Sequence, residues 1–265
     1  MNFFGGKNIL ITGATSGIGR ALAESIASPG SSLLLVARNQ TLLEEVKKSC
    51  ESKGARVYTF KVDLSRMEEV SELASAILKT VNHIDVLINN AGISQRSLAT
   101  ETIDEVDRKI MELNFFSPVK LTKLIWPLLE KSKHANIVNI SSLTGTFGFP
   151  QRSAYAASKH AMEGFFESWM LENKTKHIHF TTIAPGRIFT NISFSALKND
   201  GTQHQALDDG QAKGIKAGIC AAKIIRAIRS DKRKVYILQQ ERILLFFYRF
   251  FPSIFVYLIK KLGLK

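Results

Sequence analysis

At 265 residues, of which 45% are hydrophobic, the chain has enough apolar material for one large domain or two small ones. Its two cysteines, Cys50 and Cys220, exclude a disulfide framework and favour a reducing compartment. The seven residues before the first apolar run are too few for a signal peptide, and we therefore expect a cytoplasmic protein.

The positive charge is concentrated near the end of the chain. The formal net charge is +13, and residues 213–265 hold 13 basic residues against Asp231 and Glu241, a surplus of +11. A basic protein can bind nucleic acid. Here the basic residues alternate with long apolar runs, which favours an anionic membrane surface instead, and we expect no nucleic-acid partner.

The first elements of the chain predict a phosphate site. Residues 8–12 form a short apolar run typical of a strand, and residues 20–27 continue as a helix. The turn between them has the spacing G-x-x-x-G-x-G, and a helix that follows such a turn offers amide donors and a positive dipole to a pyrophosphate. The residues expected to line this turn are Gly13, Thr15, Ser16, Gly17, Ile18 and Gly19.

The second predicted strand, 33–37, ends where dinucleotide-binding folds distinguish NAD from NADP. An NAD site commonly has an acidic residue there for the ribose 2′-hydroxyl. This chain has Ala37 followed by Arg38, and a guanidinium pairs well with a 2′-phosphate. The pattern predicts NADP(H) in preference to NAD(H). The alternative is that Arg38 is an ordinary solvated loop residue.

The rest of the chain alternates between the two kinds of element. Strands are expected at 56–62, 84–88, 136–140, 178–183 and 234–238, and helices at 42–53, 66–81, 103–129, 153–173 and 218–230. We expect Pro118 to interrupt the long helix 103–129 and Pro127 to close it. This alternation predicts an α/β fold, a Rossmann-type doubly wound parallel sheet, in which ligands bind at the carboxyl ends of the strands. Residues expected at those ends are Gly13, Arg38, Asp63, Asn89, Ser142 and Pro185.

A catalytic group is predicted between the strand 136–140 and the helix that follows. Tyr155 and Lys159 are four residues apart in an alanine-rich helix, so they lie on one face. A nearby ammonium would lower the pKa of the phenol from about 10 and allow proton transfer near neutral pH. Ser142 stands 13 positions before Tyr155 and could hold the same substrate oxygen. The bare Tyr-x-x-x-Lys spacing is also compatible with an ordinary amphipathic helix.

Two further segments lie after the last catalytic candidate. Residues 191–214 are polar and lack periodicity, which predicts a mobile lid over a substrate site. Residues 241–265 form an aromatic and basic tail after a domain that spans residues 1–240. The sequence shows no metal-ligand cluster, and the six histidines are scattered. We therefore expect no metal site.

Several motifs in order resemble the short-chain dehydrogenase/reductase family over residues 7–240. TGATSGIG at 12–19 resembles its cofactor turn, NNAG at 89–92 its sheet-stabilising motif, and Pro185-Gly186 the segment after its sixth strand. The catalytic Ser, Tyr and Lys of the family fall on Ser142, Tyr155 and Lys159. Within the family, NAGISQRS, SAYAASKHA and the segment ending in TNIS resemble the dehydrogenase/reductase member seven group, which is linked to membranes and hydrophobic carbonyl or alcohol substrates.

The resemblance implies a hydride-transfer enzyme acting between a nicotinamide cofactor and a carbonyl or secondary alcohol of a lipid-, steroid- or retinoid-like substrate. It implies a homodimer through helices 104–129 and 153–173. Catalytic roles fall on Asn114, Ser142, Tyr155 and Lys159, with Ser142 also binding substrate, and further cofactor contacts on Arg38, Asp63, Asn90, Ala91, Gly92, Tyr155, Lys159, Pro185, Gly186 and Thr190. Two alternatives stay open: an NAD-dependent alcohol dehydrogenase, and a catalytically silent nucleotide-binding scaffold.

The tail allows three interpretations. As one helix it would place Arg242, Arg249 and Lys260 in a narrow cationic stripe on a broad apolar surface, which is typical of a helix lying in a membrane interface. A spanning helix fits less well, because the 17 residues from 243 to 259 reach roughly 25 Å against a core of about 30 Å. Alternatively, the tail folds back over the substrate pocket or a partner subunit.

Overall fold

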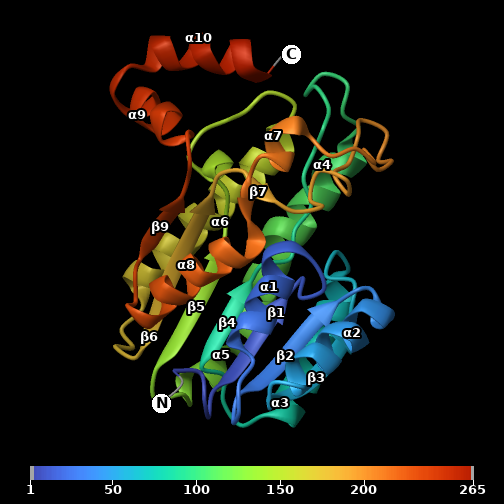
Figure 1. Cartoon of the computed structure of the whole chain (residues 1–265), viewed down its shortest axis with the longest axis vertical. Coiled ribbons are helices and arrows are strands. Elements are labelled where there is room, and N and C mark those ends of the chain that lie inside the picture. Colours follow the sequence, from blue (N-terminus) through green and yellow to red (C-terminus); the bar gives the residue numbers. More distant parts are fainter. Residues whose placement is uncertain (1–2, 264–265) are drawn as a thin grey trace.

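A parallel sheet forms the centre of the molecule. The computed structural model describes residues 3–263, and within them a seven-stranded sheet has the order β3-β2-β1-β4-β5-β6-β9, with all neighbours parallel (Figure 1). Its strands are β1 (Asn8–Thr12), β2 (Ser32–Ala37), β3 (Arg56–Lys61), β4 (Val86–Asn89), β5 (Ala135–Ile140), β6 (Ile178–Pro185) and β9 (Lys234–Ile237). This confirms the predicted doubly wound sheet. A short separate pair joins β7 (Ile188–Phe189) to β8 (Ile215–Lys216).

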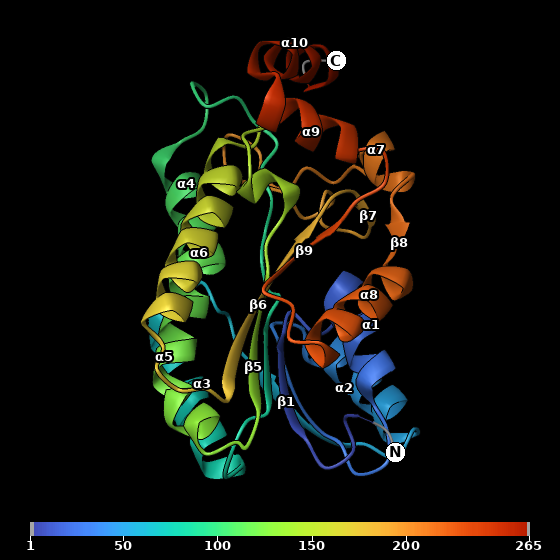
Figure 2. The ribbon, with the colours of Figure 1, turned by 90° about the vertical axis from the view of Figure 1, so that its left-hand side faces the viewer.

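Helices cover both faces of the sheet (Figure 2). One layer contains α1 (Gly17–Ile26), α2 (Gln40–Glu51) and α8 (Ala217–Arg229). The other contains α3 (Met67–Thr80), α4 (Asp104–Met111), α5 (Ser117–Glu130) and α6 (Ser153–Glu172), while the short α7 (Asp209–Ala212) lies near β7.

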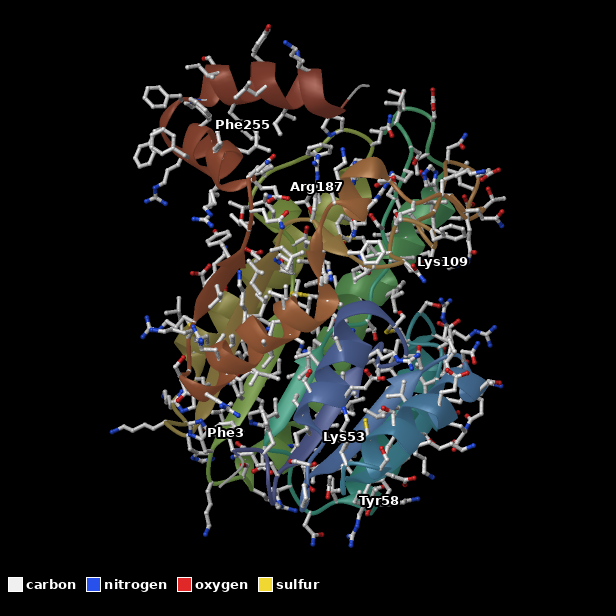
Figure 3. The ribbon with its side chains drawn as sticks, in the orientation of Figure 1. Phe3, Lys53, Tyr58, Lys109, Arg187 and Phe255 are labelled. Carbon is white, nitrogen blue, oxygen red and sulfur yellow. The ribbon has the colours of Figure 1, made fainter. Side chains whose placement is uncertain are left out.

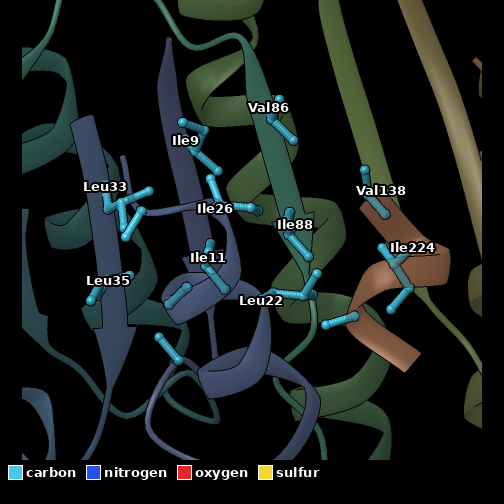
Figure 4. Packing of buried hydrophobic residues seen from close by; sticks show 14 of the residues in the cluster. Ile9, Ile11, Leu22, Ile26, Leu33, Leu35, Val86, Ile88, Val138 and Ile224 are labelled. Atoms are coloured by element: carbon cyan, nitrogen blue, oxygen red, sulfur yellow. The ribbon is translucent and has the colours of Figure 1, made fainter. Parts of the chain in front are cut away.

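The alternation of side chains along β1 shows why two layers are needed. Ile9 and Ile11 belong to the core under α1 and α8 (Figure 4). Leu10 belongs to the core on the opposite face of the sheet. All three side chains are fully buried. Removing each from water stabilises the fold by about 1.5–3 kcal/mol. A strand buried on both faces reads as a continuous apolar run, which is the pattern that predicted this strand.

The strand order also determines where a ligand can bind. β1 pairs with β2 on one side and with β4 on the other, so the chain reverses its direction of winding at β1. A doubly wound sheet opens a crevice at the carboxyl ends of the strands at such a reversal. The glycine-rich turn after β1 lies at this position.

The long helix predicted at 103–129 differs from the structure in its interruption. The break is a π-helical turn at Glu112–Phe116, between α4 and α5. Pro118 lies in the first turn of α5, directly after the π turn, and not at a break between two separate helices. Pro127 lies inside α5, which continues to Glu130. The prediction that prolines set these boundaries was therefore wrong, and the π turn carries Asn114 into the core.

The tail is two helices and not the single helix expected from its apolar run. α9 (Arg242–Phe250) and α10 (Pro252–Gly263) are separated at Phe251, whose backbone has φ −140° and ψ 68°. The residue before a proline avoids the helical region because of the proline ring, which explains the break. The predicted single cationic stripe is therefore wrong, and the last two residues of the expected tail, 264–265, lie outside the described residues.

The two tail helices fold back over the carboxyl ends of the strands (Figure 1). Phe255 and Ile259 of α10 are buried in a small cluster with Leu143, Phe147 and Leu238. Figure 3 marks Phe255 and Arg187 at this same end of the molecule. Among the described residues, no helix has the length and apolarity to cross a membrane.

Candidate active site

The glycine turn after β1 is shaped for close backbone approach. Gly13 has φ 65°, and a Cβ there would lie 2.9 Å from the Cα of Ala91. A Cβ on Gly19 would collide with the carbonyl oxygen of Gly13. Only glycine satisfies both demands without displacing the backbone. The side chain of Ser16, the residue before α1, forms no hydrogen bond with the first amides of this helix. Those amides can therefore donate to a phosphate.

The NNAG segment fastens β4 to the glycine turn. The Thr12 hydroxyl accepts hydrogen bonds from the amides of Asn90 and Ala91, each at 3.0 Å, and the Asn90 Nδ2 donates to the carbonyl of Thr12 at 2.9 Å. Inside the sheet, the Asn89 Nδ2 donates to Asn139 Oδ1 at 2.9 Å. These bonds hold β1, β4 and β5 in a fixed register beside the reversal point.

Arg38 and Asp63 follow the ends of β2 and β3, and both line the same cavity as the glycine turn. The Arg38 side chain is exposed. Burial acts to raise the pKa of Asp63, but hydrogen bonds from Ser65 and the charge of Arg38 outweigh it and lower that pKa. Asp63 is therefore an anion here, held by the Ser65 hydroxyl at 2.8 Å.

Ser142, Tyr155 and Lys159 come together as predicted, on the wall of one cavity. Ser142 follows β5, and a hydrogen bond from its side chain acts on the phenol of Tyr155. The Lys159 Nζ donates to the carbonyl of Ile140 at 2.9 Å and lies 5.9 Å from the centre of the Tyr155 ring. Both side chains are almost fully buried on α6.

The electrostatics of this group differ from the sequence expectation. Burial raises the pKa of Tyr155, against the opposing effects of Ser142, Arg96 and Arg152. Burial also lowers the pKa of Lys159 to about 8, although the charge of Glu163 favours the ammonium. The prediction of a lowered phenol pKa is thus wrong, because burial of the Tyr155 hydroxyl outweighs the groups that favour the phenolate.

Asn114 lies behind the cavity wall, in the π turn. Its Oδ1 accepts from the amide of Ile93 at 2.9 Å, and its Nδ2 donates to the Ile93 carbonyl and the Ser158 hydroxyl, each at 3.0 Å. Both amide hydrogens are used, and one acceptor position of Oδ1 remains. A Cβ on Gly92 would lie 3.0 Å from Asn114 Oδ1 and 3.6 Å from Lys159 Nζ, so glycine keeps the space between them open.

Pro185, Gly186 and Thr190 reach the cavity from the opposite side, after β6. The Thr190 methyl lies 3.0 Å from the position of a Cβ on Gly17, so this segment closes against the glycine turn. Glu241, directly before α9, accepts a hydrogen bond from the amide of Arg187 at 3.1 Å. The tail is thereby attached to the loop that follows β6.

Two arginines that the sequence reading did not single out lie in the same cavity. Arg96 Nε donates to Asp208 Oδ2 at 2.9 Å, and Arg152 Nη2 reaches the same oxygen at 3.2 Å. Burial and the charge of Arg96 lower the pKa of Arg152 to about 10. Two guanidinium groups share one carboxylate, so this wall, near Tyr155, has a positive surplus.

The cavity as a whole has a volume of about 1230 Å³, more than the 300–1,000 Å³ typical of small-molecule sites. All predicted site residues line it except Gly19 and Asn114, which support it from behind. One apolar wall combines Leu143, Phe147, Phe149 and Leu244, which pack in one cluster, and Ile192 and Phe194 add apolar lining from segment 191–214. The two phenylalanines Phe147 and Phe149, between Ser142 and Tyr155, are a sequence signal that could have indicated this wall.

A doubly wound sheet with a glycine cradle at its reversal point, next to a Ser-Tyr-Lys group, defines an oxidoreductase of the dinucleotide-dependent class. The comparisons with known proteins agree. The family model described as short chain dehydrogenase matches residues 7–200. The chain therefore belongs to the short-chain dehydrogenase family and is an enzyme acting on CH–OH and C=O groups.

Relatives of known sequence are similar over most of the chain. The mouse Dehydrogenase/reductase SDR family member 7B is 38% identical over 94% of this chain and 76% of its own length. The Drosophila melanogaster Dehydrogenase/reductase SDR family protein 7-like is 35% identical over 98% of this chain and 81% of its own. These similarities confirm the resemblance to the member seven group.

Solved structures show the same fold. A short-chain dehydrogenase from Streptomyces avermitilis superimposes with a TM-score of 0.77 at 28% identity, covering 91% of this chain and 90% of that one. One from Sphingobium yanoikuyae, in complex with NADPH, gives 0.76 at 24% identity, covering 89% and 90%. Another from Burkholderia phymatum, in complex with NAD, gives 0.77 at 24%, with the same coverage.

Proposed function

We propose that this enzyme uses NADP(H) to interconvert a carbonyl group and a secondary alcohol in a hydrophobic substrate. The observation that carries the proposal is the single cavity that joins the glycine cradle, Arg38 and the Ser142-Tyr155-Lys159 group. The glycine positions, which leave no room for a Cβ, and the helix N-terminus suit a pyrophosphate, while Arg38 suits a 2′-phosphate. A bound nicotinamide supplies or accepts the hydride.

The catalytic roles follow from the geometry of the chain's own groups. Ser142 and Tyr155 hold the substrate oxygen with their hydroxyl groups, which stabilises the charge that develops there. Tyr155 donates its proton to that oxygen in reduction and removes it in oxidation. Its raised pKa keeps the phenol protonated at neutral pH, as a general acid requires. Lys159 stabilises the phenolate that proton transfer leaves, and its ammonium would hold the ribose of a bound cofactor.

We assign Asn114 the role of holding a water that returns protons to Lys159. The free acceptor position of Asn114 Oδ1 and the space that Gly92 leaves between it and Lys159 support this role. The remaining cofactor contacts are assigned to the residues that line the cradle side of the cavity: Gly13, Thr15, Ser16, Gly17, Ile18, Asp63, Asn90, Ala91, Gly92, Pro185, Gly186 and Thr190.

The two walls of the cavity favour an amphiphilic substrate. The apolar wall accepts a lipid-like body, and the positive surplus near Arg152 accepts a polar group near the reacting carbon. Segment 191–214 contributes Phe194, Gln203 and His204 to the cavity, which supports its role as the substrate lid over a domain of residues 1–240. The proposal is tested by incubating the purified chain with NADPH and long-chain ketones, steroids, retinoids and quinones, and measuring the alcohol product. Absence of product across all these classes would overturn it.

The tail supports a peripheral membrane location. Its inner side chains Phe255 and Ile259 pack on Leu143 and Phe147, which line the cavity, while its outer side chains Ile243, Phe246, Phe250 and Tyr257 are exposed. Arg242, Arg249, Lys260 and Lys261 add positive charge, which attracts anionic lipid headgroups. We propose that the tail lies on the cytoplasmic face of a membrane and that apolar substrates enter beside it.

Replacing both Phe250 and Tyr257 by Ser is expected to reduce binding to anionic liposomes at least about tenfold, because two large exposed side chains no longer enter the interface. Flotation at low salt measures the bound fraction. Leu78→Ser is the matched control, since Leu78 is 45% exposed but lies on α3, away from the tail. A wild-type chain that does not float with the liposomes would contradict the membrane proposal.

A homodimer through α4, α5 and α6 is proposed from three exposed apolar residues: Phe116 in the π turn between α4 and α5, Leu124 on α5 and Leu171 on α6. Phe166 of α6 is fully buried and belongs to the core of the chain itself. Light scattering at micromolar concentration is expected to give twice the 29.5 kDa chain mass. A monomer mass under these conditions would contradict the proposal.

A further inference from the structure

A cluster of three metal-ligating side chains lies far from the cavity, at the amino ends of the strands. His134 precedes β5, His179 is the second residue of β6, and Asp231 lies between α8 and β9. Their ligand atoms all lie within 4.8 Å of one another. These residues are widely separated in sequence, so no spacing motif could have revealed them. The tail helices lie at the opposite end of the sheet (Figure 1).

The geometry is close to that of a metal site. His134 Nε2 lies 3.0 Å from Asp231 Oδ1, and two ligands on one tetrahedral Zn²⁺ are roughly 3.3 Å apart at bond lengths of about 2.0–2.1 Å. The rings of His134 and His179 stack with centroids 4.5 Å apart. The His134–Asp231 contact is a hydrogen bond in this structure, and the limit of 4.8 Å on the ligand separations exceeds the spacing of two zinc ligands, so binding would require the side chains to close around the ion.

The backbone conformation and the position of Asp231 are both energetically unfavourable for an aspartate. Asp231 has φ 47°, a left-handed conformation that favours glycine, and follows directly on the end of α8. A carboxylate at a helix C-terminus is also disfavoured by the helix dipole, although Arg226 and Arg229 in the last turn offset part of this. A cation bound by Asp231 would offset both costs.

The surrounding groups resemble a second coordination shell. The Asn136 Nδ2 donates to Asp231 Oδ1 at 3.3 Å, and Asn136 faces His179 in the strand register. Asn136 is 1% exposed, and its Oδ1 has no hydrogen-bond partner among the described residues. Ser132 accepts from the amide of His134 at 3.2 Å and thereby orients the loop that carries this ligand. Such outer contacts fix the orientation of ligating side chains.

We propose that His134, His179 and Asp231 bind a divalent transition-metal ion, with Zn²⁺ the best match to two imidazoles and one carboxylate, and with water as the fourth ligand. The ion ties the turn before the edge strand β9 to β5 and β6. It is structural, because the site lies at the end of the sheet opposite the cavity. Cys50 and Cys220 do not compete for the ion, since burial raises their pKa values to about 11 and about 12.

The test is calorimetric titration of the chelator-treated full chain with Zn²⁺, with Co²⁺ as a spectroscopic probe. We expect one equivalent to bind, visible d–d absorption with Co²⁺, and a melting temperature about 5–10 °C higher at 100 times the dissociation constant. His179→Gln and Asp231→Asn are each expected to weaken binding at least about tenfold. Asparagine tolerates the left-handed conformation, so Asp231→Asn preserves the turn.

His83→Gln is the matched control, because His83 also contacts a carboxylate, Asp85, at 3.2 Å but has no second histidine in such a cluster among the described residues. Its affinity for Zn²⁺ should equal that of the wild type. Absence of saturable binding in the wild type overturns the proposal. Equal affinity in the wild type, His179→Gln and Asp231→Asn overturns the assignment of the ligands. Turnover with NADPH should be the same with and without Zn²⁺, and inhibition would place the ion in the cavity instead.

Discussion

Replacing Tyr155 by Phe is expected to lower kcat at least about 100-fold, the usual contribution of a positioned general acid. The ring is 8% exposed and packed on α6, and phenylalanine preserves that packing. The substitution removes the phenol hydroxyl beside Ser142 and leaves the ring of the side chain in place. Cofactor affinity, measured by fluorescence titration, should change little in comparison.

Tyr58→Phe is the matched control for this experiment. Tyr58 lies on β3, and Figure 3 places it at the end of the molecule away from the tail. The Tyr58→Phe substitution removes one phenol hydroxyl far from the site and should leave kcat unchanged. Turnover of Tyr155→Phe within a factor of a few of the wild type would remove Tyr155 from the role of proton donor.

The second large effect concerns cofactor choice. The wild type is expected to bind NADPH at least about tenfold more tightly than NADH, because a charge-assisted hydrogen bond to a 2′-phosphate contributes about 1.5–3 kcal/mol. The double substitution Ala37→Asp and Arg38→Leu should reverse the preference, since aspartate binds a ribose 2′-hydroxyl and repels a phosphate. The dissociation constants of both cofactors are the measurement.

Arg66→Leu provides the control for charge alone. Arg66 also lowers the pKa of Asp63, yet it lies outside the residues that line the cavity. Its removal should leave the ratio of NADPH to NADH affinity unchanged. Equal affinity of the wild type for the two cofactors would show that Arg38 is a solvated loop residue and that cofactor choice is decided elsewhere.

Local constraints made much of the site predictable. The glycine turn is determined by backbone space between β1 and α1, and Gly13 and Gly19 have to be glycine for reasons that act within a few residues. The positions of Ser142, Tyr155 and Lys159 follow from one strand end and one helix face. Such short-range relations are visible in sequence spacing, so the predicted residues do converge on one cavity.

Contacts between residues that are far apart in the chain could not be predicted from the sequence. Arg96, Arg152 and Asp208 meet across separations of 56 and 112 residues, without a periodic pattern to mark them. The pKa direction of Tyr155 depends on complete burial beneath neighbouring elements, which spacing on one helix cannot show. The His134, His179 and Asp231 cluster depends on the pairing of β5 with β6 and on the turn after α8.

The tail shows how one residue can change an interpretation. Its apolar run favoured a single helix, but Pro252 divides the run, and the two helices then present different faces. Phe255 and Ile259 face the cluster above the cavity, while Phe250 and Tyr257 face outward. Both the pocket-covering and the interfacial interpretations thus have residues that support them.

The central claim, hydride transfer with proton donation from Tyr155, is tested most directly with NADPH carrying deuterium at the transferable C4 position. The chain should reduce a long-chain ketone to an alcohol with one deuterium on the carbinol carbon, detected by mass spectrometry, and Tyr155→Phe should form this product at least about 100-fold more slowly. Alcohol without deuterium, or equal rates for both proteins, would contradict the account.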